Sequence, residues 1–354
     1  MREKMFCRLS LAVCLLLLLF IVRAPHDERL ESENRAYTAF SLASPDGYFT
    51  DRLPMRESLL RLNRDITLAL GKNEFAGAFL GQGGYIFSKE STSAETLVKN
   101  LNALQDFADT LDIPVHTAVV GAKTDVLYTC LPPLYEDARQ ELWEVLRESG
   151  LQAIDLLPTL WRHGGEGKHI YYRGDHHLTT LGSYYCYREI AEVLEVTPYT
   201  AQDFSVGVVR SDFSGSDARK MLCETNDRIA LFRYANDGEY VVENLDSGEQ
   251  RRGLYDYDKL YSADPYGVFP IADCGYARIT LTSENRQKLL LLCDSYGDSL
   301  VPFLARHFDL DSVDPRYYGG SVKALTEENG YAAVLVYFGM DTLAGREVLY
   351  KIRF

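Results

Sequence analysis

The sequence predicts an α/β fold with a mostly parallel sheet flanked by helices. Short, mainly apolar runs, typical of buried strands, alternate along the chain with segments of helical periodicity. The apolar runs span residues 114–120, 151–157, 289–293 and 332–338, with a weaker candidate at 307–313. Helical patterns lie between several of them, as at 135–149 and 179–195. Such an alternation favours parallel pairing of the strands, with helices packed against the sheet.

Residues 204–285 depart from this alternation. They are rich in Gly, Asp and Tyr and contain short alternating segments such as RIALFRYA and GEYVVENL. Alternation of apolar and polar residues is typical of strands that are buried on one face. We therefore predict a β-rich insertion within a larger domain that runs over residues 35–354. An insertion at this place would overhang a site built from the segments on either side of it.

The N-terminal segment, residues 1–24, predicts a signal anchor. Three basic residues precede the apolar run LSLAVCLLLLLFIV, at 9–22, which favours an N-in, C-out orientation. The run is about as long as the apolar region of a signal peptide. Cleavage after Ala24 is disfavoured because Pro25 follows directly, although a cleaved signal peptide and a secreted protein remain the alternative. A polar linker follows at 25–34, and the rest of the chain is expected to be extracytoplasmic.

Composition excludes some classes of partner. The formal net charge is −14 and no basic stripe is present, so nucleic acid is not an expected partner. The acidic excess also disfavours a strongly anionic polymer as ligand, unless a local basic groove exists, so a neutral sugar polymer is easier to accommodate. No C-x-x-C motif or Cys–His cluster occurs, and therefore no metal or cofactor is expected. A disulfide between Cys223 and Cys274 is one interpretation of the middle region.

A serine follows the apolar run at 289–293. In the stretch LLLLCDSYGDS, Ser295 comes after an acidic residue and before Gly297, and another apolar segment begins at Leu300. This order is typical of a strand that delivers a serine to a helix start, where backbone N–H groups stabilise an anion. Ser295 is therefore a candidate nucleophile, and the alternative is a serine that only caps a helix.

Candidate partners for this serine lie upstream, in the stretch YYRGDHHLTTLGSYY. Its triplet DHH, at 175–177, falls between a β-prone run at 169–172 and the helical pattern that follows. In extended backbone, an aspartate two residues before a histidine points its side chain in the same direction, so Asp175 can orient His177. A serine nucleophile needs a base within hydrogen-bond reach and a third group that fixes the tautomer of the base. Ser295, His177 and Asp175 supply these groups, and triads occur in several chain orders.

The DHH turn and the later stretch DSYGDSLVPFL resemble the DHHW protein family, an SGNH-hydrolase-like group related to the alginate O-acetylation proteins of bacteria. Three further stretches fit the same pattern, at residues 48–72, 75–89 and 311–322. The resemblance covers nearly everything after the N-terminal segment. It implies an SGNH-like (flavodoxin-like) fold over residues 35–354. It also implies Ser295 as nucleophile, His177 as base and Asp175 as the orienting carboxylate.

The sequence departs from the family pattern at several positions. Leu178 stands where the family name expects Trp, and Gly174 stands where Thr is common. Cys293 precedes Asp294 where hydrolases carry Gly. The acid and base come before the serine, as in the alginate acetylation proteins and opposite to the SGNH class. The loss of a large aromatic at Leu178 alters the acceptor surface or the helix packing near the base.

The oxyanion hole departs most from the pattern. In SGNH enzymes the serine N–H, a glycine N–H and an asparagine side chain converge on the developing negative charge. The stretch YAAVLVYFGMDTL resembles the block that carries the asparagine, but Asp341 stands where an amide is expected. Losing one donor typically costs about 2.7–4 kcal/mol, which predicts slow turnover or another donor. Candidate oxyanion or substrate-binding residues are Gly297, Arg316, Tyr318, Gly319, Asp341 and His176, although the RYYGG stretch is equally typical of an ordinary turn.

The resemblance implies an extracytoplasmic serine acyltransferase or esterase, which moves acetyl groups to or from a cell-surface glycan beside a membrane-bound acyl-donor partner. One alternative is a catalytically inactive wall- or polysaccharide-binding protein, suggested by Asp341 and the missing Trp. A second is a metal-dependent phosphoesterase of the DHH type. Those enzymes need further upstream ligands, whereas Asp109 and Asp112 are three residues apart and His116 sits inside an apolar run.

Overall fold

The computed structural model describes residues 11–12, 15, 29–30, 35–42, 45–132, 135, 139–234, 238–272, 274–282 and 286–353. Most of the predicted anchor at 1–24 and of the linker at 25–34 therefore lies outside the described residues. Within the described ranges, no helix is long and apolar enough to cross a membrane.

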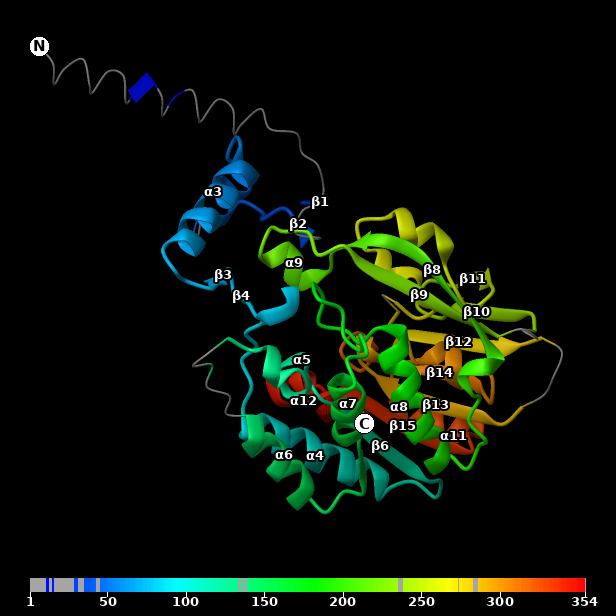
Figure 1. Ribbon diagram of the computed structural model, residues 1–354. Helices are drawn as coiled ribbons and strands as arrows, with labels where there is room; N and C mark the ends of the chain where they lie inside the picture. The colour runs from blue at the N-terminus through cyan, green and yellow to red at the C-terminus, as the bar shows by residue number, and fades with distance from the viewer. Residues whose placement is uncertain are drawn as a thin grey trace, which may run out of the picture.

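An eight-stranded sheet forms the centre of the molecule (Figure 1), in the order β11-β10-β12-β14-β13-β15-β6-β7. Its parallel part consists of β14 (Asp309–Val313), β13 (Lys288–Cys293), β15 (Ala333–Gly339), β6 (Val115–Val120) and β7 (Ala153–Asp155). These strands correspond to the five apolar runs in the sequence. The predicted α/β fold with a mostly parallel sheet is confirmed.

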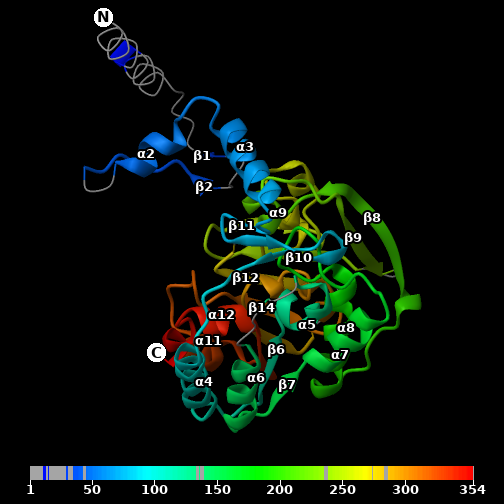
Figure 2. The ribbon, with the colours of Figure 1, turned by 60° about the vertical axis from the view of Figure 1, so that its left-hand side comes forward.

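Helices pack on both sides of this sheet (Figure 2). One group consists of α4 (Ala94–Ala108), α6 (Arg139–Glu148), α11 (Val322–Asn329) and α12 (Met340–Gly345), and the other of α5 (Lys123–Val126), α7 (Leu157–Gly165) and α8 (Thr180–Val193). The helix α8 begins where the Thr179 side chain accepts the N–H of Gly182, and it buries Tyr184, Tyr187 and Ile190 against the core. That spacing of three residues is the periodicity from which the helix was predicted.

The segment 204–285 contributes strands to two different sheets. Its first two strands, β8 (Phe204–Phe213) and β9 (Asp227–Tyr234), pair with each other and are joined through the short helix α9 (Ser216–Lys220). Its other strands, β10 (Tyr240–Asn244), β11 (Glu249–Arg252) and β12 (Tyr276–Leu281), extend the main sheet antiparallel through β14. Two 3-10 turns, η5 (Tyr257–Tyr261) and η6 (Pro265–Val268), lie between them. Three strands of the segment thus belong to the main sheet, whereas β8 and β9 form a separate two-stranded sheet.

Smaller elements complete the described chain. They are β1 (Arg29–Leu30), β2 (Arg35–Ala36), α2 (Asp46–Asp51), α3 (Arg56–Ala69), β3 (Glu74–Phe75), β4 (Ala78–Leu80), η2 (Gln82–Gly84), β5 (Ile86–Ser88), η3 (Tyr128–Cys130), η4 (Ala201–Asp203), η7 (Ser295–Gly297), α10 (Val301–Leu304) and η8 (Leu349–Arg353). The helix α3 lies beside α9 in both views (Figures 1 and 2).

The carboxyl ends of three adjacent parallel strands define one edge of the sheet. The strands β13, β15 and β6 are neighbours and run in the same direction. Ser295 follows β13, Asp341 follows β15 and Lys123 follows β6. Because ligands bind at this edge in open α/β sheets, the fold brings these residues to the expected place for a site.

The predicted disulfide is wrong. Cys223 and Cys274 are not bonded to each other, and each keeps its thiol, as do the other three cysteines of the described chain. Cys223 packs against a small separate cluster that contains Ala218 and Met221, whereas Cys274 packs against the main core. The two thiols therefore belong to different parts of the molecule.

Candidate active site

Ser295 is held at the end of β13 by the carboxylate of Asp294. This carboxylate accepts the N–H of Tyr296 and the N–H of Gly339, both at 3.0 Å, and so ties the ends of β13 and β15 together. Gly339 is required here because a Cβ at this position would lie 2.6 Å from the Tyr296 ring. The sequence predicted a helix directly after the strand, but the chain makes the 3-10 turn η7 first and α10 begins only at Val301.

Hydrogen bonds connect the three residues predicted as a triad. The Nε2 atom of His177 lies 2.8 Å from the Ser295 Oγ atom. Its Nδ1 atom lies 2.6 Å from Asp175 Oδ1. The second carboxylate oxygen of Asp175 accepts the N–H of Ser216, at the start of α9, at 2.7 Å. Residues far apart in the sequence thus form one continuous chain of hydrogen bonds.

The DHH loop does not have the extended backbone from which the orientation of Asp175 was predicted. Residues 173–177 form bends, and the β-prone run at 169–172 pairs only through an isolated bridge between Tyr171 and Leu178. Asp175 reaches His177 because its Oδ1 atom also accepts the backbone N–H of His177, at 3.0 Å. Aspartate side chains stabilise tight turns in this manner. The pairing of the two residues was correctly anticipated, but its geometric reason was wrong.

The surroundings of Asp175 keep its carboxyl ionised. Burial alone would raise the pKa of this carboxyl, but the neighbouring His177 and His176 hold the pKa well below its usual range. The hydrogen bonds from the His177 ring and from the Ser216 backbone act in the same direction. An ionised acceptor fixes the proton of His177 on Nδ1, which leaves Nε2 free to accept a proton from Ser295.

Aromatic rings enclose the His177 imidazole. The Tyr266 ring, from η6, stacks on it with a centroid distance of 4.1 Å and an interplanar angle of 7°. The Tyr296 ring lies edge-on at 5.5 Å. The Tyr266 hydroxyl donates to the Ser299 Oγ atom, at 3.2 Å, which fixes the plane of the stacked ring. Tyr266 was not anticipated, because nothing in the local sequence of the 204–285 segment marks it.

A cavity of about 240 Å³ opens beside Ser295. Of the predicted residues, Ser295, His176, Arg316 and Asp341 line it. The other three predicted binding residues, Gly297, Tyr318 and Gly319, are described by the structure and are not among its lining residues. The Gly297 N–H donates to the Asp294 carbonyl within the turn, and the Tyr318 ring packs edge-on against Tyr276.

Lys123 and Thr124 also line the cavity and were missed in the sequence. The buried Lys123 ammonium donates to the carbonyl of Asp175 at 2.7 Å, and to those of Tyr172 and Arg173 at 3.3 and 3.2 Å. It also pairs with the buried Asp217, in α9, at 2.7 Å. Lys123 therefore holds the backbone of the DHH loop. The rule that strand ends carry sites would have found both residues, since they follow β6.

Asp341 is paired with Arg139, from α6, which also contacts Asp125 at 2.5 Å. Burial raises the pKa of the Asp341 carboxyl, and the Arg139 guanidinium offsets part of this effect. The negative charge that the sequence places near the nucleophile is therefore balanced by a cation from a distant part of the chain. Arg316 is paired as well, since its guanidinium contacts the Asp314 carboxylate at 2.7 Å.

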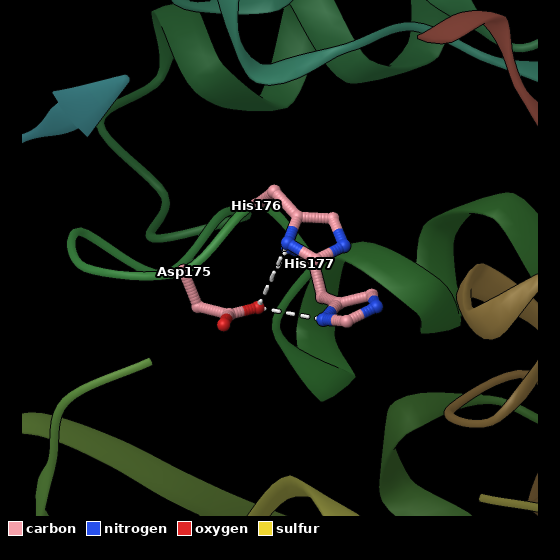
Figure 3. Close-up of side chains that lie close together, drawn as sticks. All are labelled: Asp175, His176 and His177. Carbon is pink, nitrogen blue, oxygen red and sulfur yellow. Dashed lines mark hydrogen bonds and ion pairs between the residues drawn. The ribbon is translucent and has the colours of Figure 1, made fainter. Parts of the chain in front are cut away.

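Asp175, His176 and His177 each offer one atom that could bind a metal, and these three atoms lie within 4.8 Å of one another. Figure 3 shows one oxygen of Asp175 facing both imidazole rings. That oxygen and the His177 Nδ1 atom are hydrogen-bonded to each other. A metal bound between them would therefore replace the hydrogen bond that orients His177. Asp109 and Asp112 precede β6, whereas the site follows its last residue. The upstream carboxylates thus lie at the opposite edge of the sheet.

Comparisons with known proteins agree with the motifs. A family model described as "DHHW protein" matches residues 158–313, which include Asp175, His177 and Ser295. The predicted resemblance to the DHHW family is confirmed. A second model, described as "SGNH hydrolase-like domain, acetyltransferase AlgX", matches residues 79–215. No match was found among the curated proteins.

Solved structures show that the chain shares its fold with other proteins. A DHHW family protein from Eubacterium siraeum matches with a TM-score of 0.63 and 19% identity, over 78% of this chain and 94% of that one. PatB1 from Bacillus cereus, solved with a sulfonyl adduct, matches with a TM-score of 0.64 and 17% identity, over 77% of this chain and 98% of that one. At these identities the likeness concerns the fold.

Proposed function

We propose that the protein is a serine acyltransferase or esterase that transfers O-acetyl groups to or from a cell-surface polysaccharide outside the cytoplasm. The observation that carries the proposal is the hydrogen-bonded series Asp175–His177–Ser295, whose serine lines the cavity. A serine hydroxyl becomes nucleophilic when a neighbouring base takes its proton, and the base needs a fixed tautomer. The contact between His177 and Ser295 supports the first condition and the contact between Asp175 and His177 supports the second.

The proposed reaction has two stages. In the first, His177 accepts the proton of Ser295 as the serine oxygen attacks the acyl carbonyl, and the imidazolium then gives that proton to the leaving oxygen of the donor. An acyl-serine remains. In the second, His177 takes a proton from a sugar hydroxyl or from water, whose oxygen attacks the acyl-serine, and the proton returns to Ser295. The choice between sugar and water decides between transferase and esterase.

Stabilisation of the oxyanion falls to the groups that line the cavity. The Arg316 guanidinium is a cation at the wall. The hydroxyl of Thr124 is buried and finds no hydrogen-bond partner in the described part of the chain. An unpaired buried hydroxyl costs about 1–3 kcal/mol, and a substrate oxygen would recover that cost. We assign Arg316 and Thr124 as the leading candidates for donors.

The comparisons add support of two kinds. The model that matches residues 79–215 is described as that of an acetyltransferase. The PatB1 protein has been solved with a sulfonyl adduct, and such adducts form when an activated nucleophile attacks a sulfonyl group. The membrane-bound acyl-donor partner, the anchor at 1–24 and the extracytoplasmic location remain parts of the proposal.

The test measures acetyl release from a small aryl acetate by the full chain, with and without sugar oligomers. We expect Ser295→Ala and His177→Ala each to lose orders of magnitude in kcat, with no further loss in the double variant, because triad members act as a unit. His163→Ala is the matched control, since this histidine stacks on Tyr185 and is not a cavity residue among those described. Equal rates for wild type and Ser295→Ala would refute the proposal and favour a binding protein. Chelator-sensitive activity on phosphoesters would favour the metal-dependent alternative.

A further inference from the structure

The helix α3 exposes a continuous apolar stripe. Five large apolar side chains on it and at its two ends are about half to three-quarters exposed: Met55 75%, Leu59 47%, Leu62 56%, Ile66 51% and Leu70 74%. Their spacing of three or four residues places them on one face of the helix. A stripe of this length extends about 22 Å at 1.5 Å per residue. None of the residues of α3 is buried.

The opposite face attaches α3 to the rest of the protein. The Arg61 Nη1 atom donates to the Leu222 carbonyl at 2.9 Å, and Arg64 donates to the same carbonyl. Leu68 packs against the small apolar cluster beside α9. At 100° per residue, these three side chains lie roughly opposite the stripe. A surface helix of a globular protein normally turns its apolar face inward, so the orientation of α3 is inverted.

We infer that the apolar stripe of α3 lies in the surface layer of a lipid bilayer. Helices that bind at this interface carry large apolar side chains on one face and arginines on the other, as α3 does. The predicted membrane segment at 9–22 is upstream of α3 in the same chain, which would hold the helix close to the bilayer. Phe40 and Leu42, between the two, are 55% and 90% exposed and add to the apolar surface. Large exposed apolar patches are unusual without such a partner.

The charges of α3 indicate which force drives this contact. Its three arginines are each near a carboxylate: Arg56 to Asp51 at 4.0 Å, Arg61 to Glu57 at 2.7 Å and Arg64 to Asp65 at 2.6 Å. Paired arginines attract anionic lipids only weakly. The contact therefore depends on apolar burial, and it should differ little between neutral and anionic lipid or between low and high salt.

The position of α3 also bears on the site. The Leu222 carbonyl that anchors α3 lies two residues after the end of α9. The same short helix contributes Ser216 and Asp217 to the cavity. A bilayer-bound α3 would therefore keep the cavity close to the membrane, where a membrane-bound acyl donor would be found. This consequence rests on the proposed function. The docking of α3 shares with that proposal only the predicted membrane segment at 9–22 and does not depend on the acyl-transfer chemistry.

The experiment incorporates the full chain into phosphatidylcholine vesicles and uses tryptophan as a depth probe. The chain has only two tryptophans, Trp143 and Trp161, whose emission is subtracted as background. Leu62→Trp places a probe on the stripe, and Tyr261→Trp places a matched probe at a side chain that is 87% exposed in the 204–285 segment. We expect lipid brominated near the acyl carbonyl to reduce the Leu62→Trp emission roughly twofold and to leave the Tyr261→Trp emission unchanged.

A triple variant tests the apolar stripe itself. Adding Leu59→Ser and Ile66→Ser to Leu62→Trp should abolish the quenching, while far-UV circular dichroism and ester hydrolysis stay unchanged because these side chains are exposed. Unquenched Leu62→Trp emission in pure lipid overturns the inference. If protection of α3 appears only in membranes that contain other proteins, a protein partner is the occupant and the inference is also wrong. Loss of ester hydrolysis in Ser295→Ala has no bearing on either result, so the two proposals fail independently.

Discussion

The ring of Tyr266 provides a test of how the base works. The Tyr266 ring stacks almost parallel on the His177 imidazole. When His177 takes the Ser295 proton, the imidazole becomes a cation that lies against the aromatic face of Tyr266. Cation–π attraction contributes about 0.5–1 kcal/mol at exposed sites and about 2 kcal/mol or more where water is excluded. Tyr266 is only 4% exposed, which favours the upper part of this range. We therefore expect Tyr266→Leu to lower kcat about 5- to 30-fold.

The matched variant is Tyr266→Phe, which keeps the stacked ring and removes only the hydroxyl that donates to Ser299. We expect its kcat to stay close to that of wild type, with a loss of about 1 kcal/mol in the free energy of unfolding. KM should change little in both variants, because Tyr266 is described by the structure and does not line the cavity.

The assay follows kcat and KM for a small acetyl ester, at a temperature well below the unfolding midpoint of each variant. Thermal unfolding identifies that midpoint, since Tyr266→Leu also leaves a void in the core. The reasoning would be refuted by a folded Tyr266→Leu protein that retains the wild-type kcat. It would equally be refuted if Tyr266→Phe lost as much kcat as Tyr266→Leu, because the hydroxyl and not the ring would then be responsible.

Three further predictions concern other parts of the molecule. Asp175→Asn should lower kcat by roughly 10³- to 10⁴-fold with KM little changed, because an amide does not fix the tautomer of His177; steady-state kinetics on the ester measures this. Gly215→Ala should lower kcat in a folded protein, because its Cβ would meet the Asp175 carboxylate; circular dichroism and kinetics together check it. Burial lowers the pKa of His307 from 6.5 to about 4 in the folded protein. As the pH falls, this histidine is therefore protonated in the unfolded chain before it is protonated in the folded one. Its contribution to stability is lost as the pH falls from about 6.5 to about 4. His307→Gln should remove up to about 2 kcal/mol of that acid sensitivity, allowing for solvent screening, as measured by denaturant unfolding.

The central strands β13 and β15 were predictable because each is a short run of mainly apolar residues that is buried on both faces. The strand β14 was a weaker prediction because Asp309, Asp311 and Ser312 interrupt its apolar run. The predicted runs at 289–293 and 332–338 correspond to β13 and β15. Their predicted and observed boundaries differ by at most one residue at each end. The way in which β10, β11 and β12 join the main sheet was not predictable. Those strands alternate in polarity, and alternation predicts a half-buried strand without saying which neighbour it pairs with.

The candidate triad was predictable for a different reason. Ser295 and the DHH loop lie where strand ends and helix starts give distinctive local patterns, and the family motifs gave them an order. Tyr266 and Lys123 carry no such local pattern. Their roles arise from contacts with residues far away in the sequence, such as the three carbonyls that Lys123 holds. Only the folded chain reveals those contacts.

The charge at the cavity also depends on contacts between residues that are distant in the sequence, and it bears on the choice of substrate. From the sequence, Asp341 looked like an obstacle to an oxyanion, and the open question was whether a basic groove offsets the acidic chain. The basic side chains at or beside the cavity are largely paired with carboxylates: Arg139 with Asp341, Lys123 with Asp217, Lys220 with Glu90 and Arg316 with Asp314. Among the described residues that line the cavity, Arg346 alone is basic without an ion pair. A cavity balanced in this manner offers little to a strongly anionic polymer, and it therefore favours a neutral sugar unit as the acceptor in the proposed reaction.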